Sequence, residues 1–285
     1  MTGVCWGISL MARGIHSTDA KAPSPTIGYP DRWEAFNQRH AKFVATCYPD
    51  LVDLSKAVLN RHVRITSVAD DVIFLLGRTA FEDFCELWVL AGNGYGIGAF
   101  KILRGLYEKV VTLGYLVKHP NEIQRFIDYG IVQTMRLMNR AKKQNFTRSK
   151  FSDAEYLAAE EAYQAVKGKF LDAKGRSLSW SPLDTFSMAM KSGYGLEEIS
   201  VPGYVIPNLK IHPSISDLSE RKIPSGGGTF SFSAEPQEQY ADSALVTGTH
   251  TLIVALQIHD GYFKLGVGPV IEQVQTNFAL AYLKP

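Results

Sequence analysis

The chain has little of what marks a metal-binding, disulfide-rich or membrane protein. Its 285 residues include only three cysteines, Cys5, Cys47 and Cys85. These form no Cys-x-x-Cys pair and no Cys/His cluster, so neither a zinc site nor a disulfide framework is indicated. No apolar run approaches the roughly eighteen residues that a membrane-spanning helix requires. These absences favour a protein of the reducing cytoplasm, with no membrane contact and no bound metal.

An excess of charge of one sign is also missing. Lysine and arginine total 30 against 28 aspartate and glutamate residues, which gives no overall attraction to nucleic acid or to anionic membranes. One local basic run stands at the end of a helical pattern, and its candidates for nucleic-acid binding are Arg136, Arg140 and Lys143. Such a run can contact phosphates, or it can be solvated and complement the negative end of the helix dipole.

Strand signal is weak throughout, apart from residues 229–233, whereas helical periodicity is frequent. Helical patterns occupy residues 31–47, 51–58, 72–90, 99–118, 121–138, 153–171, 183–190, 239–263 and 270–283. The glycine-rich segment 219–236 reads as a loop. We therefore predict an all-α fold, a single helical bundle of about seven to nine helices with irregular loops.

The sequence is expected to divide into a short leader and one domain. Residues 1–28 are expected to form a loosely ordered leader outside the fold, or to result from an upstream start. They do not resemble a secretory signal, because their short apolar patch precedes the first positive charge instead of following it. Residues 29–285 are expected to form one domain, in which 239–283 supply the C-terminal helices.

The segment 99–118 is the predicted centre of the bundle, because apolar side chains cover most of its circumference. One polar stripe interrupts them, formed by Lys101, Arg104, Glu108, Thr112 and Tyr115. Arg104 and Glu108 are four residues apart, as in an ordinary surface ion pair. If they are buried in a cleft, they are also candidates for a functional site, and the sequence leaves both interpretations open.

The segment before this helix contains Gly94-x-Gly96-x-x-Ala99, which matches the dinucleotide-binding fingerprint. Its context does not fit, because the preceding segment has a helical period and no acidic residue follows where a ribose would be bound. The glycines therefore predict a close turn between two helices, and no cofactor is expected.

His212, in the sequence NLKIHPS, is the most interesting of seven histidines. Histidine can act as an acid or base near neutral pH, although a lone histidine is more often a structural residue. The other histidines show no spacing that is typical of a metal site, and no metal is expected.

Two blocks resemble a known family. Leu87–Pro120 resembles the core of the bacterial domain of unknown function 5677, with Ala99, Leu103, Arg104 and Glu108 on its Ala-x-x-x-Leu-Arg-x-x-x-Glu pattern. A second block, with Trp180, Tyr194, Tyr204 and His212-Pro213-Ser214, resembles the family's Trp…Tyr…His-x-Ser region. The family-like core spans about residues 70–216.

This resemblance implies an all-α fold without a settled activity. Family members look distantly similar to HEPN-type helical proteins, many of which are RNA-cleaving toxins or phage-defence effectors. HEPN nucleases carry an arginine followed a few residues later by histidine, and this chain lacks that motif. A metal-independent site that cleaves RNA or another phosphodiester would therefore be composite. In it Arg104 would stabilise phosphate charge, His212 would be the acid or base, and Glu108 would orient one of them.

The same analogy makes Tyr107, Trp180, Tyr204 and Ser214 candidates for substrate binding. Two other functions stay open. One is a non-catalytic binding or scaffold protein of a multi-protein or defence assembly, with a protein partner or a second copy as its ligand. The other is a small-molecule pocket lined by Trp180, Tyr194 and Tyr204.

Overall fold

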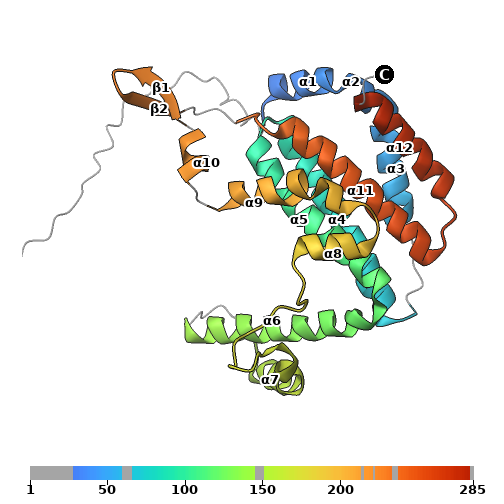
Figure 1. Cartoon of the computed structure of the whole chain (residues 1–285), viewed down its shortest axis with the longest axis vertical. Coiled ribbons are helices and arrows are strands. Elements are labelled where there is room, and N and C mark those ends of the chain that lie inside the picture. Colours follow the sequence, from blue (N-terminus) through green and yellow to red (C-terminus); the bar gives the residue numbers. More distant parts are fainter. Residues whose placement is uncertain are drawn as a thin grey trace, which may run out of the picture.

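The computed structural model describes residues 28–59, 66–144, 151–212, 215–220, 222–232 and 237–282. The expected leader lies outside this part except for Gly28, and so does the candidate residue Ser214. The described residues are predominantly helical (Figure 1), and the predicted all-α class is confirmed.

The described part contains twelve α-helices. They are α1 Pro30–Arg39, α2 Ala41–Thr46, α3 Tyr48–Leu59, α4 Val68–Gly92, α5 Gly96–Lys118, α6 Ile123–Lys143, α7 Asp153–Val166, α8 Thr185–Ser192, α9 Ile206–Ile211, α10 Ile215–Glu220, α11 Ala241–Phe263 and α12 Gly268–Tyr282. Three of them, α2, α9 and α10, have only six residues. The expected number of seven to nine helices corresponds to the longer helices of the structure, because a helix of six residues is too short to show a helical period.

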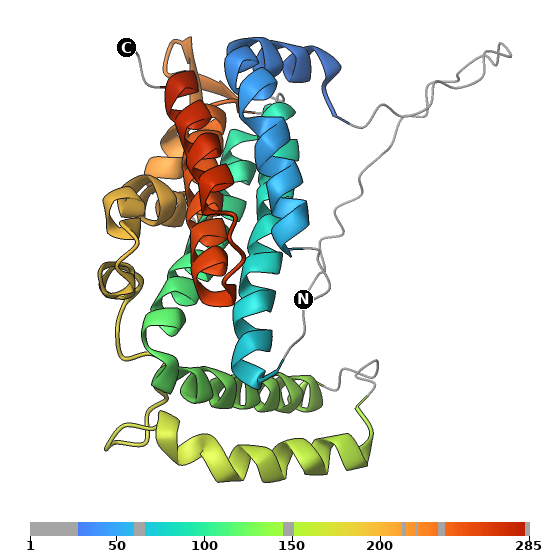
Figure 2. The ribbon, with the colours of Figure 1, turned by 90° about the vertical axis from the view of Figure 1, so that its right-hand side faces the viewer.

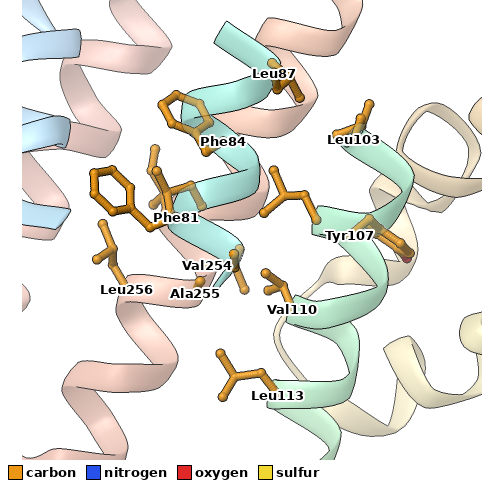
Figure 3. Packing of buried hydrophobic residues seen from close by; sticks show 14 of the residues in the cluster. Phe81, Phe84, Leu87, Leu103, Tyr107, Val110, Leu113, Val254, Ala255 and Leu256 are labelled. Atoms are coloured by element: carbon orange, nitrogen blue, oxygen red, sulfur yellow. The ribbon is translucent and has the colours of Figure 1, made fainter. Parts of the chain in front are cut away.

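The core is built from α4, α5 and α11, which come from distant parts of the chain. Figure 3 shows Phe84 of α4, Leu103 of α5 and Leu256 of α11 in one apolar cluster. All three side chains are at most 1% exposed. Since α5 is apolar on most of its surface, it also contacts α8 and α9 on its other side, as a central helix would.

The turn between α4 and α5 contains Gly94, two residues before Gly96, and the prediction of a close turn between two helices is confirmed. Gly94 has a φ of +81°, a conformation that glycine adopts without strain. Gly96 opens α5, and its amide donates to the carbonyl oxygen of Gln237 at 2.9 Å. A Cβ atom on Gly96 would lie 2.0 Å from the Gln239 carbonyl oxygen. The glycines thus let the chain before α11 approach the start of α5.

The N-terminal helices and α12 cover the α4/α11 side of the core. In Figures 1 and 2, α12 runs beside α11 and ends near α1 and α2. An aromatic cluster fixes this layer, with Tyr48 stacked on Trp88 at a centroid distance of 4.1 Å and Phe43 at 5.8 Å from Trp88. Phe43 also lies 5.5 Å from the ring of Tyr282, so α2 and the last helix, α12, are neighbours in space.

Helices α6 and α7 form a separate layer that lies across one end of the bundle (Figures 1 and 2). Pro120 follows α5, and its ring disfavours helical geometry in the preceding residue, so the chain changes direction there. The two helices bury a small apolar cluster of their own, which includes Val132, Val166 and Phe170. Asp128, 4% exposed, accepts a hydrogen bond from Lys169 at 2.6 Å beside it.

The glycine-rich segment differs from the expected loop, because part of it forms a β-hairpin. Strands β1 (Lys222–Gly226) and β2 (Thr229–Phe232) pair antiparallel and project from the bundle in Figure 1. The physical reason is the turn: Gly227 and Gly228 both have positive φ, which a two-residue hairpin turn favours. Within the described ranges no helix combines the length and apolar character needed to cross a membrane.

Candidate functional site

A cavity of about 530 Å³ lies beside α5. It is enclosed by α5, by the start of α8 with the loop before it, and by a single π-helical turn, η4 (Val201–Val205). Its lining consists of Glu108, Thr112, Ser179, Trp180, Ser181, Leu183, Asp184, Thr185, Phe186, Met188, Tyr204 and Val205. Three of the predicted site residues, Glu108, Trp180 and Tyr204, therefore share one cavity.

Trp180 is held in the cavity wall by the α5–α6 junction. Its ring meets Tyr115 and Phe126 edge-on, at centroid distances of 6.0 and 5.1 Å. Arg125 Nε donates to the carbonyl oxygen of Trp180 at 2.6 Å. The loop that carries Trp180 is thus fixed from both sides, although it has no regular secondary structure.

Arg104 and Glu108 form the expected pair on α5, and Tyr204 joins them. Arg104 Nη2 lies 3.0 Å from Glu108 Oε1, and the guanidinium carbon lies 5.3 Å from the centre of the Tyr204 ring. The side chains are 28% and 36% exposed, so the pair is neither buried nor free in solvent. Arg104 Nε is itself buried, and no hydrogen-bond partner for it exists among the described residues. The guanidinium therefore keeps one donor that the protein leaves unused.

Asp184 is a second carboxylate in the cavity, and the sequence reasoning missed it. It caps α8, where its side chain accepts a hydrogen bond from the Ser187 amide at 2.7 Å. This hydrogen bond lowers the pKa of Asp184, so the carboxylate is ionised at neutral pH. An aspartate directly before a helical pattern is a capping signal, which could have placed the residue at the start of α8 but not in the cavity.

The electrostatic character of the cavity follows from these two carboxylates. Its lining contains no lysine, arginine or histidine. Arg104 compensates the charge of Glu108 at one oxygen, and no hydrogen bond within the described chain engages the other oxygen, Oε2. The lining thus combines excess negative charge with the aromatic rings of Trp180, Phe186 and Tyr204.

Tyr107 does not line this cavity. Its side chain is fully buried, and its hydroxyl donates to the carbonyl oxygen of Leu196 at 2.9 Å. Burial, reinforced by the nearby Glu197 carboxylate, raises the pKa of Tyr107 far above the ordinary value, so the phenol stays protonated. Tyr194, the third aromatic residue of the expected small-molecule pocket, is also outside the lining; Lys118 lies over its ring at 5.2 Å.

His212 is not joined to the Arg104–Glu108 pair. It follows the last residue of α9, and its side chain is exposed. Across the part of the chain that the structure describes, it makes no hydrogen bond or ion pair with Arg104 or Glu108. The structure therefore brings together two members of the expected composite site and leaves the third at the surface.

The basic residues Arg136, Arg140 and Lys143 are exposed on α6, in the layer across the end of the bundle (Figure 2). Arg136 also bonds Ser177 Oγ and lies 5.7 Å from the ring centre of Tyr129. They form a surface of their own, separate from the cavity lining. The described ranges contain no group of three or more His, Cys, Asp or Glu side chains that could hold a metal ion.

The fold and the cavity define an all-α helical bundle with an aromatic, acidic pocket beside its central helix. The chain belongs to a family of unknown function, DUF5677, whose model matches residues 70–228, more than half of the chain. This range includes α5, all but the first two residues of α4 and every residue of the cavity, and it agrees with the expected core at about 70–216. A comparison with curated proteins gave no match, and a comparison with solved structures gave none either.

Proposed function

We propose that the protein binds a small organic cation in the cavity beside α5, without catalysing a reaction on it. The observation that carries this proposal is the composition of the lining, in which Glu108 and Asp184 stand among aromatic rings and no cationic side chain is present. Carboxylates attract a cation directly, and the faces of aromatic rings attract it through their quadrupole. An anionic ligand such as a phosphate would meet two carboxylates instead.

The size and wall of the cavity suit such a ligand. A volume of about 530 Å³ lies within the usual range of small-molecule sites. Trp180 and Tyr204 are each held by other side chains, so the wall exists before a ligand enters. A preformed wall reduces the entropy that binding would otherwise cost.

The proposal is tested by isothermal titration calorimetry of the full chain with agmatine and choline as cations, citrate as an anion and glucose as a neutral compound. Only the cations should bind. Asp184→Asn should weaken binding about tenfold, equivalent to about 1.4 kcal/mol, because asparagine keeps the helix cap but removes the charge. Glu108→Gln should act in the same direction.

Asp172→Asn is the matched control, since Asp172 carries the same charge in a surface loop outside the cavity lining. It should leave the affinity unchanged. Binding of glucose with no effect of Asp184→Asn would contradict the proposal and indicate a site for neutral polyols. The absence of any binding by either cation would also contradict it.

A second candidate function is the cleavage of RNA or another phosphodiester, as in the distantly similar HEPN-type effectors. The observation that favours it is the partly exposed guanidinium of Arg104 next to Glu108. In this hypothesis Arg104 binds phosphate, His212 transfers the proton, and the exposed cations on α6 hold the RNA. His212 would then have to approach the pair when RNA binds.

Expression of the wild type and of His212→Ala in bacteria separates the two functions. Because His212 is exposed, its replacement should leave the amount of folded protein unchanged. RNA fragments with the wild type alone would support cleavage, whereas intact RNA with both proteins supports binding without catalysis. We place either function in a reducing compartment, since Cys47 and Cys85 are both free thiols.

A further inference from the structure

A second and larger cavity lies where the two ends of the described chain meet. It has a volume of about 580 Å³ and lies between α2, the first turns of α11 and the last residues of α12. Its lining is formed by Arg39, His40, Lys42, Phe43, Asp242, Ser243, Val246, Thr247, Ala281 and Tyr282. None of these residues falls in the range matched by the family, so this cavity is a separate feature of the chain.

A hydrogen-bonded chain that runs from the exposed Asp242 through the buried His40 to the half-buried Tyr282 fixes one wall of this cavity. His40, 6% exposed, has Nε2 at 2.9 Å from Asp242 Oδ1 and Nδ1 at 3.0 Å from the Tyr282 hydroxyl. Burial raises the pKa of Tyr282 well above its ordinary value, so the phenol keeps its proton. The Asp242 carboxylate can only accept a hydrogen bond, so His40 Nε2 is the donor to it. The three elements that carry these residues are thereby held in one arrangement.

Two cationic side chains, Arg39 and Lys42, line this cavity against one carboxylate, Asp242, which is held by His40 and Arg39. Lys42 Nζ bonds the carbonyl oxygen of Leu280, and in the described ranges no carboxylate lies within ion-pair distance of it. Arg39 is 40% exposed and makes only long contacts, 3.6 Å to Glu238 and 3.5 Å to Asp242. Lys42 thus presents an uncompensated positive charge beside the cavity, and Arg39 can reorient toward a ligand.

An apolar cavity of about 400 Å³ adjoins the polar one at the α11–α12 interface. Its lining consists of Val246, His250, Ile253, Gln275, Phe278, Ala279 and Tyr282. Val246 and Tyr282 line both cavities. Figures 1 and 2 show α11 and α12 side by side over this length. One end of the combined groove is therefore cationic and hydroxyl-rich, and the other end is lined mainly by hydrocarbon.

We infer that this groove binds an amphiphilic carboxylate, with the head group at Lys42 and Arg39 and a hydrocarbon tail between Ile253 and Phe278. The head gains the charge of Lys42 and the hydroxyls of Ser243 and Thr247 as partners. The tail removes apolar surface from water, which is favourable in proportion to its area. Val246 and Tyr282 mark the boundary, where the hydrocarbon tail of the ligand would leave the polar cavity and enter the apolar one.

The test is isothermal titration calorimetry of the full chain with decanoate, decanol and decyltrimethylammonium, each below its micelle concentration. Decanoate should bind most tightly and decyltrimethylammonium least. Lys42→Gln should weaken decanoate about tenfold without changing decanol binding. Lys56→Gln, an exposed lysine of α3 outside both linings, is the control and should have no effect.

A second pair of variants tests the tail. Ala279→Phe fills the apolar arm and should abolish decanoate binding, whereas Leu280→Phe, the neighbouring residue at 58% exposed, should not. Circular dichroism melting verifies that each variant is folded. Equal affinity for decanoate and decanol, or unchanged binding in Lys42→Gln, would overturn the inference. None of these four variants changes Glu108 or Asp184. Failure of this inference would therefore leave the function proposed for the cavity beside α5 untouched.

Discussion

The hydroxyl of Tyr107 lies 2.9 Å from the carbonyl oxygen of Leu196 and donates a hydrogen bond to it. This bond joins the central helix α5 to the short helical turn η3 (Leu196–Ile199), which directly precedes η4. The Tyr107 ring also lies 6.2 Å from the ring of Tyr204, which lines the cavity. A fully buried residue of the core thus positions a wall of the candidate site.

Tyr107→Phe should lower the free energy of unfolding by about 1–3 kcal/mol. The substitution removes the donor and leaves the Leu196 carbonyl oxygen buried with no partner from the side chain. Urea denaturation measures the change. Tyr156→Phe is the control, because the hydroxyl of Tyr156 bonds Asn139 at the exposed surface and water can replace that bond. A loss as small as that of the control would show that the Tyr107 bond is unimportant for stability.

Gly96→Ala should destabilise the protein by about 1–3 kcal/mol or more, the usual cost of overpacking. The new Cβ atom would lie 2.0 Å from the carbonyl oxygen of Gln239, and a backbone atom cannot move aside as a flexible side chain can. Thermal unfolding followed by circular dichroism measures the effect.

The matched substitution in the same helix is Gly105→Ala. There the nearest atom to a new Cβ is Asp83 Oδ2 at 3.6 Å, an ordinary contact. Alanine favours the helix by about 1 kcal/mol over glycine, so this variant should be as stable as the wild type or more stable. If both variants lose stability equally, helix geometry rather than the approach of Gln239 explains the glycine at 96.

Much of the fold could be predicted because helices are specified locally. The period of residues 99–118 identified the central helix, and the glycines before it identified the turn. The start of α4 is local in the same way, because the Ser67 side chain accepts a hydrogen bond from the Asp70 amide at 3.1 Å. Each of these signals lies within a few residues of the structure that it predicts.

The sites could be predicted only in part, because they are assembled by packing between distant segments. Glu108 and Tyr204 were both named as site residues, but nothing local indicates that Asp184 lies beside them. His40 and Tyr282 are 242 residues apart in the sequence, and their contact follows from the packing of α12 on α2. The exposure of His212 could not be foreseen either, since a histidine next to a proline is compatible with both burial and solvent.

Asp128 should make the packing of α6 and α7 sensitive to acid. Burial alone would raise its pKa, but hydrogen bonds from Lys169 and Gln124 outweigh that effect and hold the pKa below the ordinary value of 3.8. A carboxyl group whose pKa is lower in the folded state stabilises the fold above its unfolded pKa. This contribution is lost as the pH falls from about 4 through the folded pKa.

The measurement is the free energy of unfolding of wild type and Asp128→Asn between pH 7 and pH 2.5. The wild type should lose more stability than the variant over the acid range, and the difference between them should shrink as Asp128 becomes protonated. Parallel curves for the two proteins would show that other carboxylates account for the acid sensitivity.

The Arg104–Glu108 pair distinguishes a structural role from a binding role. Both side chains are about one third exposed, so their coupling in a double-mutant cycle should be only about 0.3–0.5 kcal/mol, as for other helix pairs four residues apart. A fully buried pair would instead lose about 3–5 kcal/mol when one partner is removed. Arg104→Ala should therefore stay folded, at a cost of about 1 kcal/mol that comes mainly from the lost contact with Tyr204.

The cycle consists of Arg104→Ala, Glu108→Gln and the double variant, each measured by urea denaturation and by titration with agmatine. Small coupling in stability together with a large loss of agmatine affinity in Glu108→Gln assigns the carboxylate to binding. Coupling of several kcal/mol with unchanged affinity would assign the pair to the architecture of the bundle. The two readouts separate because the proposed cation would use Oε2 of Glu108, whereas the coupling in stability depends on Oε1, which bonds Arg104.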